Sequence, residues 1–421
     1  MSALEQLQAC IDELEIIDTH EHLPPRECDR PAQNDVLAEY LSHYFSCDLV
    51  SAGLTTKQLE FVRNPSGDLM ERWKLAEPYW NVARNTGYGR SLDLAAKGLY
   101  GIERIDATTI GELDEAFRAA REKGNHYRYV LKEKSRIALS IVDSFPDCDR
   151  DFFRCSIRLE NFICPTHRRG LVEMGERFGV RVHTLEDWCQ TLRLCLEDCL
   201  HRGDIALKIG LAYRRSLRFD KVSHADAERA FVELFADVNS PYGRADIKVA
   251  KPLQDYMMHR LLALADERGL TVQVHTGIQE GYGNILYDSN PVLLSNLFLE
   301  YENVRFDVFH MGYPYVMELG TVAKNFRNVF IDMCWGHIVS PEAARRALIE
   351  WLDAVPANKI SAFGGDYLFV DGVYGHQLLA RRDVAAALAQ KVTDRSFSLD
   401  RAKEIARMLF VDNPKALFGL Q

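Results

Sequence analysis

The chain has 421 residues, of which 47% are hydrophobic and 27% are charged. This hydrophobic share can fill a large core, which excludes an intrinsically disordered protein. The 51 Lys and Arg against 61 Asp and Glu give a net charge of −10. Because phosphate contacts need an excess of basic residues, we expect no nucleic-acid partner.

The first 23 residues, MSALEQLQACIDELEIIDTHEHL, are acidic and lack the basic head and apolar run of a signal peptide. No stretch approaches the ~18 apolar residues of a membrane helix, so we expect no membrane partner. The ten cysteines form no Cys-x-x-Cys pair, and a chain of this length does not depend on disulfides. These features predict a cytoplasmic protein with reduced thiols.

Short apolar, β-branched runs alternate with longer helical patterns, which is typical of a parallel sheet buried on both faces. They predict eight strands, at residues 15–19, 136–142, 157–162, 205–211, 270–275, 304–310, 329–335 and 360–363. Thr184 and Asp187 have the spacing of a capping box and predict a helix from residue 185. Eight βα units close naturally into a barrel, so the predicted fold class is α/β, a (β/α)8 TIM barrel.

A long segment, residues 24–134, separates the first two predicted strands. A crossover needs only about a dozen residues, so this segment is an insertion. It is rich in Trp and Tyr and has helical patterns at 68–82 and 111–123. We interpret it as a helical lid over the mouth of a single barrel domain spanning 1–421. A structural decoration far from the site is the alternative.

The strongest local signal is DTHEHL at residues 18–23, at the end of the first predicted strand. Residues i and i+2 of a strand point the same way, so His20 and His22 project together. Two imidazoles placed in this way can bind one divalent metal. Alone the pair is a weak signal, since 13 histidines make chance His-x-His pairs common.

Other predicted strands carry residues of similar chemistry near their ends. His275 and His310 close the fifth and sixth strands, Asp366 follows the eighth, and Lys208 lies inside the apolar fourth. In a barrel the carboxyl ends of all strands open on one face, so these side chains converge. A buried carboxylate among imidazoles needs a cation, which predicts a metal site. Lys208 alone could instead neutralise Asp366.

This order of residues resembles the amidohydrolase superfamily. The segments TGYGRSLDLAAKGLYG, LKIGLAYRR, VHTG with SNPVLLSNL, FHMGYPY and NVFIDMCW are similar to its amidohydrolase-2 branch. Within that branch the greatest likeness is to the group with nodulin-like domains fused to glutamine synthetase. The resemblance covers nearly the whole chain and implies a barrel with one or two divalent ions, Zn²⁺ first and Mn²⁺ second. One departure is Gly364-Gly365-Asp366, where many relatives have Ser-Asp or Thr-Asp.

The resemblance also implies roles for individual residues. The implied metal ligands are His20, His22, His275 and Asp366. Asp366 would also take a proton from the water that the metal activates and return it to a leaving group. His310 would bind a second metal or polarise a substrate oxygen. Lys208 is carbamylated and bridges two metals in some branches and is unmodified in others.

Three further residues are candidates for substrate binding. Tyr213 and Arg214 follow Lys208 and could hold a substrate carboxylate, although Arg214 fits a surface ion pair equally well. Trp335 could flank the substrate, although a tryptophan at a strand end is more often part of the core.

We therefore expect a metal-dependent hydrolase that cleaves an amide, lactone or ester of a small, anionic, carboxylated substrate. A non-oxidative decarboxylase or a uronate-isomerase-like enzyme on the same metal site is the alternative, with His275 arguing against the isomerase. A non-catalytic binding barrel is a third reading, which the intact ligand set disfavours. A homo-oligomer is left open, and the substrate lies beyond the sequence because loops set barrel specificity.

Overall fold

The computed structural model of the chain describes residues 1–143, 147–236 and 247–421. Eight parallel strands form one sheet in sequence order, which confirms the predicted TIM barrel. The strands are β1 (Ile16–Glu21), β2 (Ile137–Asp143), β3 (Phe153–Arg158), β4 (Ala206–Ile209), β5 (Thr271–Val274), β6 (Arg305–Val308), β7 (Val329–Asp332) and β8 (Ile360–Ser361).

The barrel is nearly closed where the chain beyond β8 runs beside β1. The Thr19 backbone N–H donates to the Phe363 carbonyl at 3.0 Å, and the Asp366 N–H donates to the His20 carbonyl at 2.8 Å. These bonds join the carboxyl ends of the first and last strands. They therefore bring the two ends of the barrel sequence to one place.

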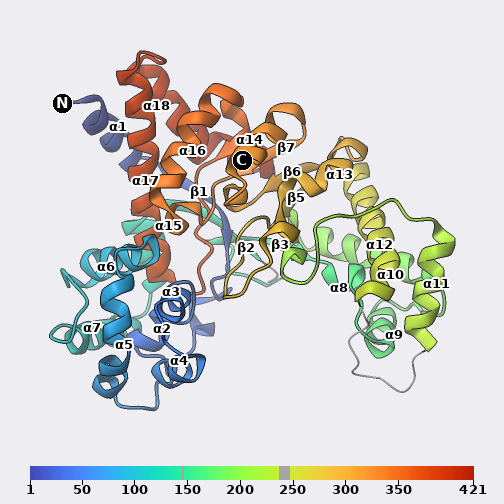
Figure 1. Cartoon of the computed structure of the whole chain (residues 1–421), viewed down its shortest axis with the longest axis horizontal. Helices are drawn as coiled ribbons and strands as arrows, with labels where there is room; N and C mark the ends of the chain where they lie inside the picture. The colour runs from blue at the N-terminus through green and yellow to red at the C-terminus, as the bar shows by residue number, and fades with distance from the viewer. Residues whose placement is uncertain (144–146, 237–246) are drawn as a thin grey trace.

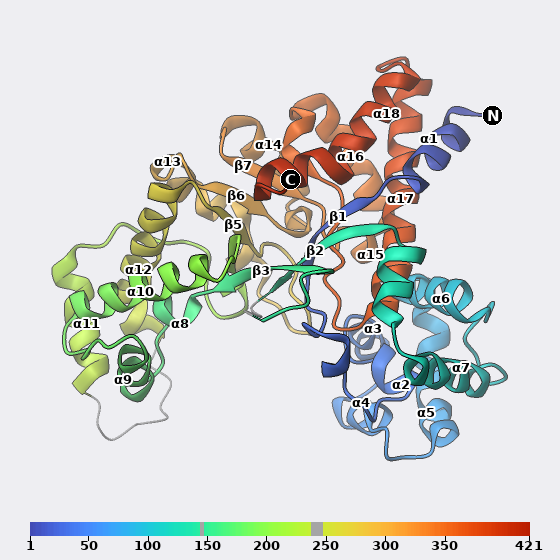
Figure 2. The ribbon, with the colours of Figure 1, turned by 180° about the vertical axis from the view of Figure 1, so that it is seen from behind.

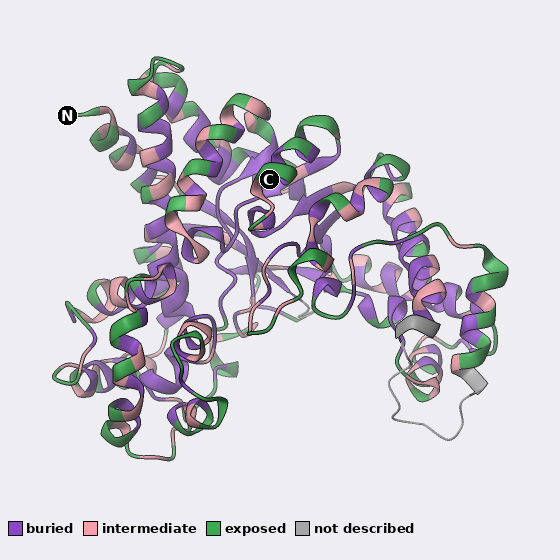
Figure 3. Cartoon of the chain, in the orientation of Figure 1, coloured by how far each residue is buried: buried purple, intermediate pink, exposed green. Residues whose placement is uncertain are grey.

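Helices cover the outside of the strands, which are buried between them (Figures 1 and 3). Outside the insertion they are α1 (Ala3–Asp12), α8 (Glu160–Ile163), α9 (Arg168–Arg177), α10 (Leu185–His201), α11 (His224–Ala236), α12 (Ile247–Arg268), α13 (Ser295–Glu300), α14 (Val316–Asn325), α15 (Gly336–Val339), α16 (Pro341–Ala354), α17 (Val370–Thr393), α18 (Leu399–Arg407) and α19 (Asn413–Phe418). The predicted capping box is present: Thr184 accepts from the Asp187 N–H, and Asp187 accepts from the Thr184 N–H.

Within the described residues, none of the helices combines the length and apolarity needed to cross a bilayer.

Seven strands start within one residue of the prediction, but the third does not. The predicted strand at 157–162 was wrong, because β3 ends at Arg158 and Glu160–Ile163 form the short helix α8. Phe162 packs on Trp188 of α10 with ring centroids 4.5 Å apart, and the Trp188 indole N–H donates to the Phe162 carbonyl. An apolar run alone does not distinguish a strand from a buried helical turn, and this run contains both.

Residues 24–134 fold into six helices that form a lobe on one side of the strands, opposite α8–α12 (Figures 1 and 2). They are α2 (Val36–Tyr40), α3 (Phe45–Ser51), α4 (Thr56–Arg63), α5 (Leu69–Ala83), α6 (Gly87–Tyr100) and α7 (Ile110–Lys123). A buried carboxylate, Asp371 of α17, ties this lobe to the barrel. It accepts from Tyr100 at 2.7 Å and Tyr40 at 3.2 Å, and lies 2.8 Å from His126 Nε2.

Replacing Asp371 with Ala should therefore destabilise the protein by at least ~3 kcal/mol, because two hydroxyls and an imidazole would lose their buried partner. Urea unfolding measures this loss. Asp394→Ala, at the exposed end of the same helix, is the control and should change stability by no more than ~0.5 kcal/mol. Equal effects of the two variants would contradict the anchoring role of Asp371.

Candidate metal centre

Three ligand atoms from the two ends of the barrel sequence meet at its carboxyl face. His20 Nε2 and His22 Nε2 lie 3.5 and 3.2 Å from Asp366 Oδ1. Two atoms that bind one metal at ~2.0–2.1 Å on tetrahedral corners are about 3.3 Å apart. The three side chains are therefore spaced as ligands of a single divalent cation, and they form one group within 4.8 Å.

The protonation of these groups also suits a metal. Burial, and then Lys208, lower the pKa of His20 well below its usual value, so the imidazole is neutral. Burial alone would raise the pKa of Asp366, but His20 and His22 oppose it and hold the pKa well below the usual value. His20 Nδ1 is buried without a hydrogen-bond partner among the described residues. A carboxylate and neutral imidazoles are the forms that bind a divalent metal, so the residues present fit one.

His275 and His310 lie together beside this group. His310 Nε2 is 2.9 Å from His275 Nδ1 and 3.6 Å from Asp366 Oδ2. His275 Nε2 is 2.9 Å from the Ile278 carbonyl, so it donates there and leaves Nδ1 as an acceptor. The structure thus brings His310 to Asp366, whereas His275 faces His310 and lies outside the group of His20, His22 and Asp366.

Cys334, which the sequence analysis did not single out, lies against the same carboxylate. Its Sγ is 3.8 Å from Asp366 Oδ2, and the residue is completely buried. No Cys-x-x-Cys spacing marks it, because its neighbours in space come from other strands. Its position near the end of the seventh predicted strand, at residues 329–335, was the available signal.

Lys208 of β4 lies beside the first group. Its Nζ is 3.3 Å from His20 Nε2 and 3.7 Å from the centroid of the Phe309 ring. Burial lowers the pKa of this amine to about 8, with Asp143 and Asp366 opposing the shift. Lys208 is therefore a buried amine that is easily deprotonated at the edge of the metal-type ligands.

A hollow of about 250 Å³ opens over these residues. It is lined by His22, His43, Tyr44, Arg158, Lys208, Tyr213, His275, Glu280, Asp366 and Leu368. The insertion contributes His43 and Tyr44, and β3 contributes Arg158, whose Nε donates to Asp143 at 2.6 Å. The volume lies below the usual range of ligand sites, so it suits a small molecule.

The candidates for substrate binding are placed differently from one another. Tyr213 lines the hollow, and its hydroxyl oxygen accepts from the Glu280 N–H. Arg214 is exposed and is not part of the lining. Trp335 is buried behind the site, stacked on His310 at 4.5 Å and against Tyr44 at 4.4 Å. The guanidinium at the hollow is instead that of Arg158, which the misplaced third strand concealed.

Backbone and carboxyl groups hold Asp366 from behind. The Gly365 N–H donates to Asp18 Oδ1 at 2.9 Å, and the Tyr367 N–H donates to Glu21 Oε2 at 3.0 Å. A Cβ on Gly365 would lie 1.7 Å from Glu21 Oε1, so no larger residue fits there. A Cβ on Gly364 would lie 2.8 Å from Cys334 Sγ. These two close approaches explain why glycine occupies both positions before Asp366.

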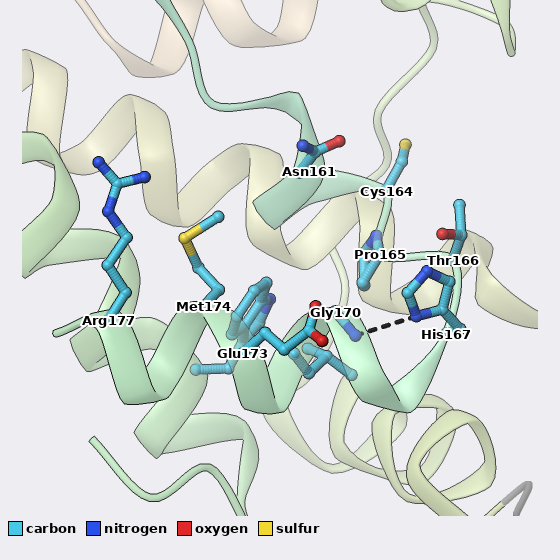
Figure 4. A pocket seen from close by; sticks show the side chains of 11 residues that line it. Asn161, Cys164, Pro165, Thr166, His167, Gly170, Glu173, Met174 and Arg177 are labelled. Atoms are coloured by element: carbon cyan, nitrogen blue, oxygen red, sulfur yellow. Dashed lines mark hydrogen bonds between the residues drawn. The ribbon is translucent and has the colours of Figure 1, made fainter. Parts of the chain in front are cut away.

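A second, larger hollow of about 400 Å³ lies between α8, α9 and α10, away from these ligands (Figure 4). His167 caps α9 there, accepting through Nδ1 from the Gly170 N–H at 2.9 Å. Asn161, Met174 and Arg177 line its other side. None of the predicted site residues contributes to it among the described part of the chain.

The chain is thus an eight-stranded TIM barrel whose carboxyl face gathers His and Asp side chains that could hold a metal. The sequence model of the amidohydrolase family, Amidohydro_2, matches residues 196–420, and the chain belongs to this family. Proteins of this superfamily are enzymes that generally bind divalent metals.

Individual relatives match over parts of the sequence or over the fold. Protein fluG of Emericella nidulans is 28% identical over 229 residues, which are 51% of this chain and 26% of that protein. A uronate isomerase of Cutibacterium acnes is 25% identical over 195 residues, 42% of each chain. The chain thus spans less than half of the length of these two relatives. The solved uronate isomerase of Thermotoga maritima superposes with a TM-score of 0.83 over 99% of this chain and 97% of that chain, at 16% identity, which shows a shared fold.

Replacing Asp366 with Ala should lower the affinity for Zn²⁺ at least ~100-fold, because it removes the carboxylate that would bind the metal together with the two imidazoles. Competition with a chromophoric chelator measures the affinity. His167→Ala, in the second hollow, should leave it unchanged. If the Asp366 variant kept its affinity for Zn²⁺, the metal would not bind at this face of the barrel.

Gly365→Ala should destabilise the chain by about 1–3 kcal/mol, because the added methyl group overlaps the Glu21 carboxyl. It should also weaken Zn²⁺ binding, since Asp366 must shift. Thermal unfolding and the same chelator competition report both effects. In Gly111→Ala, where a Cβ meets open space on α7, both quantities should stay near those of the unmodified chain.

Proposed function

We propose that the chain is a divalent-metal hydrolase that cleaves an amide, lactone or ester of a small carboxylated substrate. The observation that carries this proposal is that one 250 Å³ hollow is lined by the metal-type ligands His22 and Asp366 and by the cationic groups of Arg158 and Lys208. His20, His22 and Asp366 would hold the metal. A bound Zn²⁺ or Mn²⁺ would supply Lewis acidity and lower the pKa of water towards ~7.

Arg158 would bind the substrate carboxylate. Its guanidinium offers a planar fork that matches a carboxylate, and Asp143 fixes its orientation through Nε. Tyr213, held by the Glu280 N–H, would close the same side of the hollow. These contacts would place the scissile bond over Asp366.

Asp366 would accept a proton from the attacking water through Oδ2, the oxygen that does not face His20 and His22, and would return it to the leaving group. The ammonium form of Lys208 would stabilise negative charge on the substrate oxygen. His310 does not line the hollow, so it would act on Asp366 and His275 rather than on the substrate. His43 and Tyr44 would exclude bulk water from above.

Isomerisation of a sugar acid is the second candidate. The sequence match to a uronate isomerase from Cutibacterium acnes favours it. Both reactions would use the same metal and the same carboxylate-binding arginine, but only hydrolysis consumes water.

The test is a screen of the Zn²⁺- or Mn²⁺-loaded protein against carboxylated amides, lactones, esters, uronates and aromatic acids, followed by mass spectrometry in ¹⁸O-labelled water. Hydrolysis gives products that together gain one water and carry ¹⁸O. An isomerase gives a product with the substrate's mass, and a decarboxylase releases CO₂. The last two outcomes would each refute hydrolysis, and turnover that persists in Asp366→Ala would refute the site.

Arg158→Met should raise the KM for the carboxylated substrate ~10–100-fold with a smaller change in kcat, because a charge-assisted contact is lost. Arg214→Met is the matched control and should leave KM within about twofold, since Arg214 is exposed outside the hollow. Steady-state kinetics decide between them. If only Arg214→Met raised KM, Arg214 rather than Arg158 would be the residue that binds the substrate carboxylate.

A further inference from the structure

The two carboxylate oxygens of Asp366 face different groups. Oδ1 lies near the Nε2 atoms of His20 and His22. Oδ2 lies 3.6 Å from His310 Nε2 and 3.8 Å from Cys334 Sγ. His310, Cys334 and Asp366 form a second group of ligand atoms, all within 4.8 Å of one another.

The spacing of this second group fits a metal. At bond lengths of ~2.0–2.1 Å to N or O and ~2.3 Å to S, tetrahedral ligands lie about 3.3 Å (N to O) or about 3.6 Å (S to O) apart. The observed distances of 3.6 and 3.8 Å need only a small contraction. His275 Nδ1, 2.9 Å from His310 Nε2, is a further nitrogen beside the same position.

All three residues of the group are buried and have a left-handed backbone. Their exposed fractions are 0% for His310 and Cys334 and 2% for Asp366. Their φ angles are +63°, +36° and +55°. Such conformations cost about 1–2 kcal/mol per non-glycine residue, so packing around the site over-determines the three positions.

We propose that Asp366 bridges two cations and that the second is held by His310 Nε2, Cys334 Sγ and Asp366 Oδ2. The thiolate ligand selects a thiophilic divalent ion such as Zn²⁺, Co²⁺ or Cd²⁺ over Mn²⁺ or Mg²⁺. On binding, the Cys334 thiol transfers its proton to solvent and the sulfur lone pair forms the bond to the metal. The proton that His310 Nε2 donates to His275 Nδ1 moves to His310 Nδ1, which has no other partner among the described residues, and the Nε2 lone pair forms the second bond.

This second position has a consequence that rests on the proposed function. The proposed hydrolase uses Asp366 Oδ2 to accept a proton, and a second cation occupies that oxygen. The first equivalent of metal therefore supports turnover and the second inhibits it.

The test is a titration of metal-free protein with Co²⁺, followed by absorption spectroscopy. A thiolate-to-Co²⁺ charge-transfer band should appear in the near ultraviolet with the second equivalent. Cys334→Ser should lose the band and bind the second equivalent at least ~100-fold more weakly. Cys164→Ser, which removes another buried thiol lining the second hollow, should keep both. A wild-type protein that binds one ion without the band, or a band that persists in Cys334→Ser, would overturn the proposal.

A second measurement uses the wild-type chain, so its result does not depend on whether the Cys334→Ser variant folds. Zn K-edge absorption of the protein with two equivalents of Zn²⁺ should show a sulfur neighbour at ~2.3 Å. A shell of nitrogen and oxygen alone would overturn the second position. That result would refute the second metal position but would still be compatible with the proposed hydrolase using one metal. A sulfur shell in a protein that turns over no substrate would instead support the second metal position and refute the proposed hydrolase.

Discussion

The burial of one carboxylate, Asp366, is the constraint on which the rest of the site depends. It lies where the first and last strands meet, and its own N–H is bonded to the His20 carbonyl. A buried carboxylate without a cation or hydrogen-bond donors is costly. His20 and His310 are themselves kept neutral by burial, so they stabilise the carboxylate only through a bound metal or by donating N–H groups. The residues that close the barrel are therefore the same residues that could hold a metal.

This constraint extends to residues that cannot touch a substrate. Asp18 and Glu21, completely buried on β1, accept backbone N–H groups on either side of Asp366 and fix the direction of its side chain. Burial raises the pKa of Asp18 to about 6, and burial together with the nearby Asp18 raises the pKa of Glu21 well above its usual value. Gly365 follows from the space that Glu21 occupies, and Gly364 from the space that Cys334 and Thr19 occupy. The sequence HEH at residues 20–22 thus contains two candidate metal ligands and, between them, the residue that supports the third candidate, Asp366.

The barrel could be predicted because its strands are apolar, β-branched runs at regular intervals, a pattern that depends on burial alone. His20, His22 and Asp366 were found by the same route, since a strand end is visible in sequence and all strand ends converge. Arg158 and Cys334 were not found, for two different reasons. Arg158 is a strand-end residue hidden by an apolar run that continues into α8, and Cys334 has no partner near it in sequence. The orientation of His275 towards Ile278 is set by a loop, which periodicity cannot describe.

The net charge of −10 describes the whole chain and not the hollow. The charged residues of the lining are Arg158 and Lys208 against Asp366 and Glu280, so their formal charges cancel. An anionic substrate gains little from such a balance. Binding a divalent cation adds positive charge within a site of low dielectric, where each charge acts strongly. In the proposed function the metal would therefore create the field that attracts a carboxylated substrate, so substrate binding would depend on metal binding.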